Sequence, residues 1–265
     1  LSRNGDIDME EVEMCDDDAD GNLKPISEYT ATIATSNLHE LAAVTPVCNA
    51  ATRFLAVDLL SDVAAGYRND YDRKKAQLLI AKLQGAVNST GYKTPYNRTS
   101  ATTGLTSWVD MIARVTEEVG DGGLFVLSFK TRMQMIKDAI EAGISGPLAT
   151  VLMSGDLTPI LGQPAVVVPN ELLPTLNSGE SKSFTVEGAT VTVDQAVFYF
   201  DPSTFSGRTS GGLQYDLSTD ASYEVDGTVK SAFQRNELVL RGSFFRGGAI
   251  RDASKVSSMY AGGIS

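Results

Sequence analysis

The part of this chain that comes nearest to a known kind of chemistry is the acidic run that begins at Asp16. Asp16, Asp18 and Asp20, followed by Gly21, match the first half of a calcium-binding loop, where oxygen ligands alternate along the chain and a glycine makes the sharp turn. The match ends there, because Ser27 stands where the loop needs a bidentate glutamate. We therefore interpret the run as an exposed acidic hairpin tip, and these three aspartates as a partial match to a metal site.

The sequence carries no signature of a common catalytic centre. None of the motifs GxSxG, GxxxxGK[ST], GxGxxG and HExxH occurs in it. His39 is the single histidine, and nucleophilic triads or histidine metal sites need a histidine placed beside a nucleophile or other ligands. We expect His39 to be structural or solvated. The sequence thus predicts a protein that is not an enzyme, with no catalytic residues and no cofactor.

The charge balance argues against a protein that reads a nucleic-acid sequence. The chain has 33 acidic and 22 basic residues, a net charge of −11, and its longest basic run is Arg73, Lys74 and Lys75. DNA binding depends on lysine and arginine that displace counterions from phosphate, and it shows as a basic patch or stripe. An acidic surface repels DNA instead, as suits the inner wall of a container.

Cysteine content and hydropathy further narrow the class of protein to which the chain can belong. Cys15 and Cys48 are too few for a disulfide framework and too far apart for a CxxC motif, which favours an intracellular folding compartment. No apolar run approaches the roughly 18 to 20 residues of a membrane helix, so we expect a soluble protein without membrane contact. With 265 residues, 42% of them hydrophobic, the chain can bury a large core, and we assume two lobes.

The first half of the chain shows an extended pattern and then helical ones. Threonine and apolar residues intermingle over 24–47, which predicts a long hairpin arm with its tip at Asp20 and Gly21. The spacing over 51–84 predicts one long helix, capped at Gly85 and followed by a loop over 88–103. The helical stripe consists of Leu60, Val63, Tyr67 and Tyr71.

The middle of the chain alternates helix, strand and helix, and strands dominate after it. A helix over 106–119 ends at Gly120, an apolar strand follows at 124–128, and a third helix stops at Gly143. This alternation predicts a sheet with helices packed on its faces. The two helical stripes are Trp108, Ile112, Val115 and Val119, and then Phe129, Met133, Ile136 and Ile140.

Four strand patterns follow. The run over 162–169 lacks alternation, which predicts burial on both faces. Residues 184–193 predict a hairpin that turns at Glu187 and Gly188, and 196–200 is a further apolar strand. From Tyr215 onward the chain is again strand-like, notably over 232–250.

Four segments, taken in order, resemble the major capsid proteins of tailed bacteriophages that have the HK97 fold. The first begins LKPISEYTATIATSNLHELAAVTPV at 23–47 and continues into the long helix. The second is LFVLSFKTRMQMIKDAI at 124–140, followed by LTPILGQPAVVVPNELLP at 157–174. The third is AVFYFDPSTFSGRTSGGLQYDLSTDASYEVDG at 196–227, and the last begins AFQRNELVLRGSFFRGGAI at 232–250. Together they cover nearly the whole chain.

This resemblance implies an α+β, HK97-like capsid fold with an axial and a peripheral domain, a long spine helix and an extended β-hairpin loop. The implied divisions are an N-terminal arm remnant and extended loop at 1–50, the peripheral domain with the spine helix at 51–103, the axial domain at 104–211, peripheral strands at 212–245 and the return to the axial domain at 246–265. The first residue is Leu1 rather than Met, which we interpret as proteolytic processing or a missing leader.

The resemblance also implies a function and its partners. The chain would be a structural subunit of an icosahedral phage head that assembles as pentamers and hexamers around a double-stranded DNA genome. Its location would be the virion capsid, assembled in the host bacterial cytoplasm. The implied partners are other copies of the chain, a portal, a head-maturation protease, a decoration or stabilising protein, and packaged DNA without sequence-specific contact.

Charged residues on the loop, the long helix and the late strands are the expected contacts between subunits. On the helix, their simplest interpretation is a solvated face with weak ion pairs, and a neighbouring subunit is the alternative. Some relatives join subunits through a Lys–Asn isopeptide bond, for which Lys24 and Asn236 are the available pair, and we expect no such bond here. The expected contact residues are Lys24, Glu28, Arg68, Asp72, Arg73, Lys74, Arg235 and Arg246.

Two alternatives stay open at this point. An encapsulin, a bacterial compartment shell that holds an enzyme cargo, shares the fold and differs in its contents. A soluble two-lobed α/β binding protein or enzyme, acting as a monomer or small oligomer, belongs to a different class. Particle formation separates the second alternative from the capsid interpretation, and the contents of the particle separate the first.

Overall fold

The computed structural model describes residues 2–4, 30–32, 38–54, 58–95, 101–141, 162–176 and 178–261. The chain divides into two compact units, Leu1–Thr35 and Ser36–Ser265. In the first unit, β1 (Ser2–Asn4) pairs with β2 (Thr30–Thr32), and the two strands are antiparallel. The prediction that all of 24–47 belongs to one hairpin arm is wrong for its second half, because residues 39–48 pair with residues 237–246 of the second unit. The tip expected at Asp20 and Gly21 lies outside the described residues.

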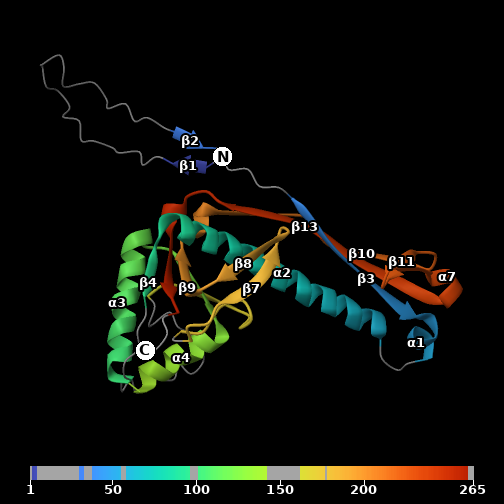
Figure 1. Ribbon diagram of the computed structural model, residues 1–265, viewed down its shortest axis with the longest axis horizontal. Helices are drawn as coiled ribbons and strands as arrows, with labels where there is room; N and C mark the ends of the chain where they lie inside the picture. The colour runs from blue at the N-terminus through green and yellow to red at the C-terminus, as the bar shows by residue number, and fades with distance from the viewer. Residues whose placement is uncertain are drawn as a thin grey trace, which may run out of the picture. The chain divides into compact units, whose positions relative to one another are not determined.

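A five-stranded mixed sheet lies at one end of the second unit (Figure 1). The two apolar runs predicted to be strands are adjacent in it, with Leu127 opposite Val197. The central strand is antiparallel to both of its neighbours, and each outer strand is parallel to the strand beside it. In spatial order the strands are β4 (Lys93–Pro95), β14 (Val256–Tyr260), β9 (Gln195–Phe200), β5 (Leu124–Ser128) and β6 (Ala165–Val168).

The long helix predicted over 51–84 is in fact two helices, α1 (Asn49–Phe54) and α2 (Leu59–Thr90). The carboxylate of Asp58 accepts a hydrogen bond from the N–H of Ser61 (3.2 Å) and caps the start of α2. The predicted cap, Gly85, lies inside α2, whose buried residues continue to Val87 and carry the helix past the glycine. The left-handed cap is Gly91, with φ 75°. The predicted loop over 88–103 accordingly contains the end of α2, strand β4 and the start of the next helix.

The two helices predicted around β5 are α3 (Ala101–Val119) and α4 (Phe129–Glu141). Helix α3 ends at Gly120, as predicted, and its residues Ile112, Val115 and Val119 are buried. These residues form the packing face that the spacing predicts. In the described part of the chain, no helix is long and apolar enough to cross a membrane.

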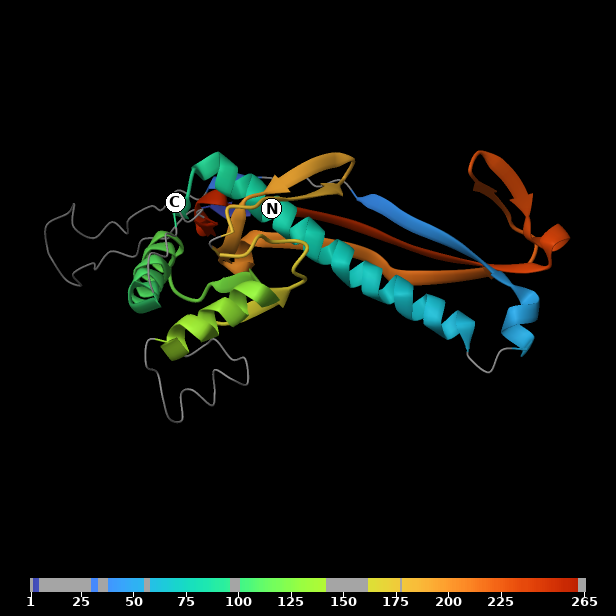
Figure 2. The same cartoon turned by 60° about the horizontal axis from the view of Figure 1, so that its bottom comes forward.

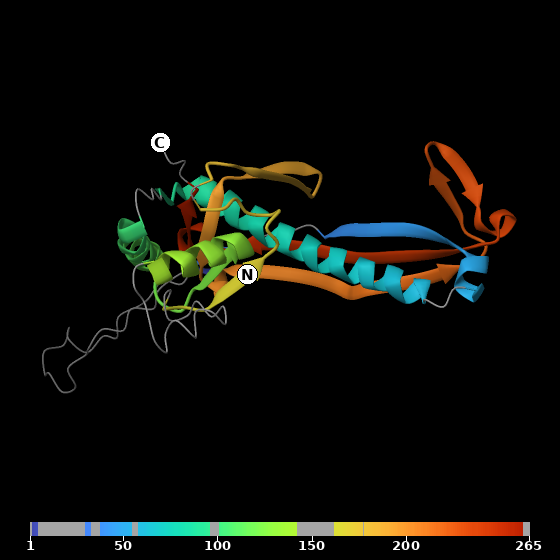
Figure 3. The same ribbon diagram turned by 90° about the horizontal axis from the view of Figure 1, so that it is seen from below.

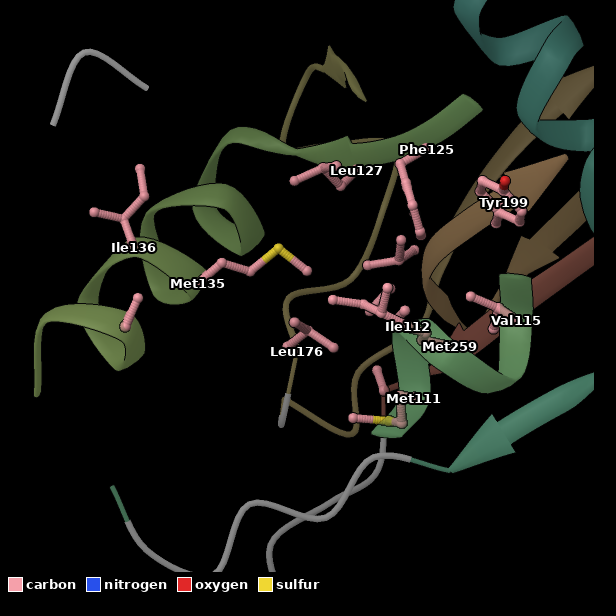
Figure 4. Packing of buried hydrophobic residues seen from close by; sticks show 14 of the residues in the cluster. Met111, Ile112, Val115, Phe125, Leu127, Met135, Ile136, Leu176, Tyr199 and Met259 are labelled. Carbon is pink, nitrogen blue, oxygen red and sulfur yellow. The ribbon is translucent and has the colours of Figure 1, made fainter. Parts of the chain in front are cut away.

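Helices cover both faces of the five-stranded sheet, which explains why its middle strands are apolar throughout. All six residues of β9 are buried. Val197 and Tyr199 belong to a cluster with side chains of α3 and α4, which Figure 4 shows from close by. Phe198 and Phe200 alternate with them along the strand and pack with α2 on the opposite face. Among the described residues, the core therefore consists of two clusters separated by the sheet.

The prediction that Phe129, Met133, Ile136 and Ile140 form the packing face of α4 is wrong for all of them except Ile136. Phe129, Met133 and Ile140 are 50%, 46% and 45% exposed, while Met135, Ile136 and Ala139 are buried. Two apolar stripes overlap on this helix, and the sheet covers the one that contains Met135. The sequence alone could not choose between them.

The prediction that the run over 162–169 is buried on both faces is also wrong. Strand β6 is an edge strand that pairs with β5 among the described residues. Val166 and Val167 are 43% and 37% exposed. A continuous apolar run is typical of a strand covered on both faces, but here the position at the edge decides the exposure.

A three-stranded antiparallel sheet extends along α2 to the other end of the second unit (Figures 1 and 2). Its strands, in spatial order, are β10 (Phe205–Ser218), β13 (Glu237–Ile250) and β3 (His39–Cys48). The Tyr67 hydroxyl of α2 donates to the carbonyl oxygen of Leu240 (3.0 Å), and the Tyr71 ring meets Phe244 edge-on at 4.6 Å. The helical stripe that contains Tyr67 and Tyr71 was therefore predicted correctly. The missing side chain of Gly242 permits this packing, because a Cβ there would lie 2.7 Å from Tyr67 Cδ2.

Two short hairpins complete the second unit. The hairpin predicted at 184–193 is confirmed as β7 (Lys182–Val186) and β8 (Ala189–Val193), with positive φ at Glu187 (53°) and Gly188 (78°). The second hairpin, β11 (Ser222–Val225) and β12 (Thr228–Ser231), leads into the short helix α7 (Ala232–Arg235). Single-turn helices η1 (Pro202–Thr204) and η2 (Ala253–Lys255) begin at aspartate caps.

Candidate interaction surfaces

The described residues form no metal-binding cluster. No three side chains of His, Cys, Asp or Glu come together there in a way that could hold a metal ion. The partly exposed His39 places Nε2 4.0 Å from Glu187 Oε1. Asp16, Asp18 and Asp20, the partial match to a calcium loop, lie outside the described residues. What the structure offers in their place is exposed apolar surface.

The first such surface is the outer face of α4. We call Phe129, Met133 and Ile140 the α4 face, and each of these side chains is between 45% and 50% exposed. Their spacing of four and seven residues places them on one side of the helix. Isolated exposed apolar residues are common, but several large ones on one face are typical of an interaction site.

The second surface lies at the other end of the second unit, around β12 and α7. Val229 and Phe233 are 72% and 75% exposed, which are the highest exposed fractions among the large apolar side chains that the structure describes. Leu217 of β10 is 55% exposed. We call these three residues the distal patch. Beside it, the β11–β12 hairpin and the three-stranded sheet enclose a groove of about 570 Å³, lined in part by Val44 and Val239.

The β11–β12 hairpin is attached to the sheet through one carboxylate. The Tyr223 hydroxyl donates a hydrogen bond to Glu237, and Arg235 Nε lies 3.0 Å from Glu237 Oε1. The hydrogen bond to Glu237 raises the pKa of Tyr223, and the same hydrogen bond holds the pKa of Glu237 below its ordinary value. At neutral pH this contact therefore joins a carboxylate to an un-ionised phenol.

The α4 face and the distal patch lie at opposite ends of the second unit, as the views of Figures 1 and 3 agree. They differ in shape as well, because one is a helix face and the other consists of a hairpin and a short helical turn. Two different, separate surfaces on one molecule suit heterologous contacts, in which each copy uses both surfaces and the copies form rings or extended arrays.

Four of the predicted contact residues lie on α2. Arg68 and Asp72 are exposed there. Arg73 lies 3.4 Å from Asp70 Oδ1 and 3.1 Å from Glu171 Oε1 within the same chain. Lys74 is partly buried and lines a cavity of about 220 Å³. Arg73 is thus already engaged in ion pairs within its own chain.

The remaining predicted contact residues have different surroundings. Arg235 belongs to the hairpin attachment through Glu237. Arg246 is 2% exposed, so in this conformation its side chain belongs to the interior of the chain rather than to an exposed contact. Lys24 and Glu28 lie outside the described residues, so the structure does not describe the pair Lys24 and Asn236 considered for an isopeptide bond.

Sequence reasoning missed the distal patch, although a signal for it was present. Asp226 and Gly227 have φ of 52° and 76° and form the turn between β11 and β12. An Asp-Gly pair between two strand-like segments is a strong hairpin signal. Applied here, it would have placed Val229 on a short exposed hairpin and Phe233 just after it.

Comparison with known proteins shows what this fold is similar to. No protein-family model matches the chain, and no curated protein matches its sequence. Solved structures do match over nearly its full length. A chain from Mycobacterium phage Adephagia superposes with a TM-score of 0.60 at 15% identity, covering 97% of this chain and 82% of that one.

Two further matches come from structures described as capsids. One is the capsid of cyanophage P-SCSP1u, with a TM-score of 0.62, 12% identity, and coverage of 95% of this chain and 81% of the other. Another is the capsid of a native GTA particle, with a TM-score of 0.57, 13% identity, and coverage of 100% and 84%. The predicted α+β fold of phage capsid type is thereby confirmed.

Proposed function

We propose that this chain is the shell-forming subunit of a tailed-phage head, a structural protein that works by assembling and not by catalysis. The match of nearly the whole chain to capsid structures of a cyanophage and a GTA particle supports this most strongly. Because the match spans the sheets, the long helix and both ends of the second unit, it concerns the architecture and not one common motif. The proposed location is the virion capsid, after assembly in the host bacterial cytoplasm.

Pentamers and hexamers are the proposed assembly states. Rings of five or six copies arise when one surface of a subunit meets a different surface of the next, and both ring types together tile a closed shell. The α4 face and the distal patch supply two such surfaces. Stable contacts bury roughly 1,600 Å² in total, so each patch would be the apolar centre of a larger contact.

The charge of the subunit supports a container without sequence-specific DNA contact. A net charge of −11 repels a polyanion and does not hold it to the wall. We propose double-stranded DNA as the content, and a portal, a head-maturation protease and a decoration or stabilising protein as further partners. The proposed division of the subunit remains the arm and extended loop at 1–50, the peripheral segments at 51–103 and 212–245, and the axial domain at 104–211 with the return to it at 246–265.

Expression of the full-length gene product, followed by size-exclusion chromatography and negative-stain electron microscopy, tests this function. We expect closed shells tens of nanometres across, or free rings of five and six copies. A 28.2 kDa monomer that forms no particles at high concentration, even with the phage protease supplied, would contradict the proposal and favour a soluble α/β protein.

The contents of particles isolated from infected cells test the second part. We expect nuclease-protected double-stranded DNA inside the shell. A shell that contains a folded enzyme and no DNA would identify an encapsulin-type compartment. In both outcomes the subunit assembles into a shell, and the outcomes differ only in what the shell encloses.

A further inference from the structure

A groove of about 380 Å³ lies between α2 and the strands β6, β10 and β13. Most of the side chains that line it are apolar, among them Leu78 and Leu79 from α2, Val166 and Val168 from β6, and Phe205 from β10. Val166 is 43% exposed, so the groove is open to the surroundings and not a closed cavity of the core. A site of this kind suits an occupant with apolar side chains.

One buried charged side chain in the wall of this groove has donor atoms without an acceptor among the described residues. Arg246 is 2% exposed, and its Nε and Nη1 are buried without a hydrogen-bond partner among the described residues. Burial lowers the pKa of the guanidinium, which shows how poorly its charge is solvated there. A buried charge is unfavourable unless it is paired and hydrogen-bonded. Nε and Nη1 of Arg246 are therefore hydrogen-bond donors that an acceptor would stabilise.

The acidic groups that act on Arg246 from within the chain are already engaged elsewhere. Glu187 and Asp70 are the carboxylates whose charge favours the protonated guanidinium. Glu187 Oε2 lies 2.8 Å from Lys82 Nζ, and Asp70 Oδ1 lies 3.4 Å from Arg73 Nε. Neither carboxylate forms an ion pair with Arg246 within the described part of the chain. The acceptor for Arg246 therefore has to be a group other than these two carboxylates.

A carboxylate carried on an apolar segment fits the groove best. Arginine binds a carboxylate through two parallel N–H···O bonds, and such charge-assisted bonds are strong where water is excluded. A free inorganic anion would meet the guanidinium but would leave the apolar walls uncovered. An extended segment that carries acidic and apolar side chains on the same side satisfies both requirements at once.

This chain contains such a segment. Residues 6–14 read DIDMEEVEM, in which the adjacent Glu10 and Glu11 interrupt an alternation of acidic and apolar residues. Because successive side chains of an extended segment point to opposite sides, this interruption places the acidic residues Glu11 and Glu13 on the same side as the apolar Ile7 and Met9. The segment carries no basic residue that would compete for these carboxylates.

From these observations we infer that the groove receives residues 6–14 of a second copy of this chain, with Arg246 binding one of their carboxylates. The inference rests on the proposed function, since an assembly of identical subunits brings a neighbour's segment to every groove. It assigns to Arg246 a role between subunits in spite of its burial. The charge that the free subunit leaves unpaired is then satisfied when the shell forms.

Photocrosslinking in mixed particles tests this inference. Val166 is replaced by p-benzoylphenylalanine, and unlabelled and ¹⁵N-labelled subunits are mixed, assembled and irradiated. Mass spectrometry then identifies the crosslinked peptides and their isotopic composition. We expect crosslinks to a peptide that contains residues 6–14, with mixed heavy–light pairs that can arise only between two copies.

Matched variants show whether Arg246 anchors the segment. Loss of one partner of a buried charge pair weakens binding on the order of tenfold or more, so R246M should lower the crosslink yield by at least that factor. R246K should retain part of the yield. R208M removes an exposed arginine that lines the same groove and should change the yield less than about twofold, within the range of weak surface charges.

The segment is tested from its own side by the double variant E11Q and E13Q, which should reproduce the loss seen in R246M. The control double variant D16N and D18N removes as much charge outside residues 6–14 and should keep the yield. Purely light–light and heavy–heavy crosslinks would overturn the second copy as occupant. Crosslinks to another peptide would overturn the segment. Particles without crosslinks would overturn the inference and leave the proposed function standing, whereas the absence of particles would overturn both.

Discussion

The two halves of the second unit differ in how much of their surface the subunit itself covers. In the half built on the five-stranded sheet, all six residues of β9 are buried between helices on both faces. In the half built on the three-stranded sheet, none of the 14 residues of β10 and one of the ten of β3 is buried. The first half is a complete three-layer core, and the second is an open sheet with one helix on one side.

Under the proposed function, this difference indicates where the stability of the subunit and the energy of assembly reside. The two clusters around β9 contain most of the buried large side chains and give the free subunit its core. The open sheet carries exposed apolar residues such as Val44, Leu217 and Tyr215. In the proposed shell, neighbouring copies complete this half. Mutations should therefore separate folding from assembly according to the half in which they lie.

The largest effect is expected from the pair Phe198→Ala and Phe233→Ala. Phe198 is fully buried between β9 and α2, so Phe198→Ala should lower the free energy of unfolding by about 3–5 kcal/mol. Phe233 is 75% exposed, and Phe233→Ala should change that free energy by less than about 0.5 kcal/mol. Denaturant unfolding of the unassembled subunit measures both.

The order of the two effects reverses when the measurement is the assembly of the folded subunit instead of its stability. Phe233→Ala should reduce the yield of particles at fixed subunit concentration, because it removes the most exposed apolar side chain of the distal patch. Gln234→Ala changes the adjacent exposed polar residue and serves as the control. Normal particle yield from Phe233→Ala would remove the distal patch from the contacts between subunits.

A smaller effect is expected from Asp194→Asn. Burial of Asp194 opposes ionisation, but hydrogen bonds from Gln195, Lys93 and Gln84 and the charge of Lys93 together hold its pKa below the ordinary value. Lys93 Nζ lies 3.3 Å from Asp194 Oδ2, and Gln84 Nε2 lies 3.0 Å from Oδ1. The carboxylate thus joins α2, β4 and β9 beside the five-stranded sheet. We expect Asp194→Asn to lower the free energy of unfolding by up to about 1 kcal/mol at pH 7.

The sign of the pH dependence follows from the lowered pKa. A carboxyl group with a lower pKa in the folded than in the unfolded state stabilises the protein above its unfolded pKa, and this stabilisation is lost as the pH falls through the folded pKa. The difference between wild type and Asp194→Asn should therefore shrink as the pH falls below about 5. Denaturant unfolding at several pH values measures it. Asp216→Asn, at an exposed position on β10, serves as the control variant.

The smallest effect is expected from Arg73→Gln. Arg73 forms exposed ion pairs with Asp70 and Glu171, so its removal should lower the free energy of unfolding by about 0.5 kcal/mol or less, and by less still in high salt. Lys137→Gln, which breaks an exposed pair with Glu141, is the matched control. A fall in particle yield from Arg73→Gln alone, with stability unchanged, would support its predicted place between subunits. A large loss of stability that salt does not alter would show instead that Arg73 holds the two halves together.

Local patterns predicted the elements that local chemistry controls. The strand at 124–128, the end of α3 at Gly120 and the turn at Glu187 and Gly188 appear where the sequence places them. Each depends on residues close together in the chain, such as a run of apolar residues or a glycine that accepts positive φ. The order of the capsid-like segments likewise predicted the fold that the comparisons confirm.

Tertiary structure alone decided which face of each element is covered. Helix α4 has two overlapping apolar stripes, and the position of β5 and β9 buries the stripe of Met135 and leaves Phe129 exposed. Strand β6 has the composition of a central strand but lies at an edge. An arginine is expected at the surface from its charge, yet β13 places Arg246 against α2 in a groove without an acceptor. Composition and spacing fix the surface that a segment can bury, whereas only the packing of distant segments determines the surface that remains exposed.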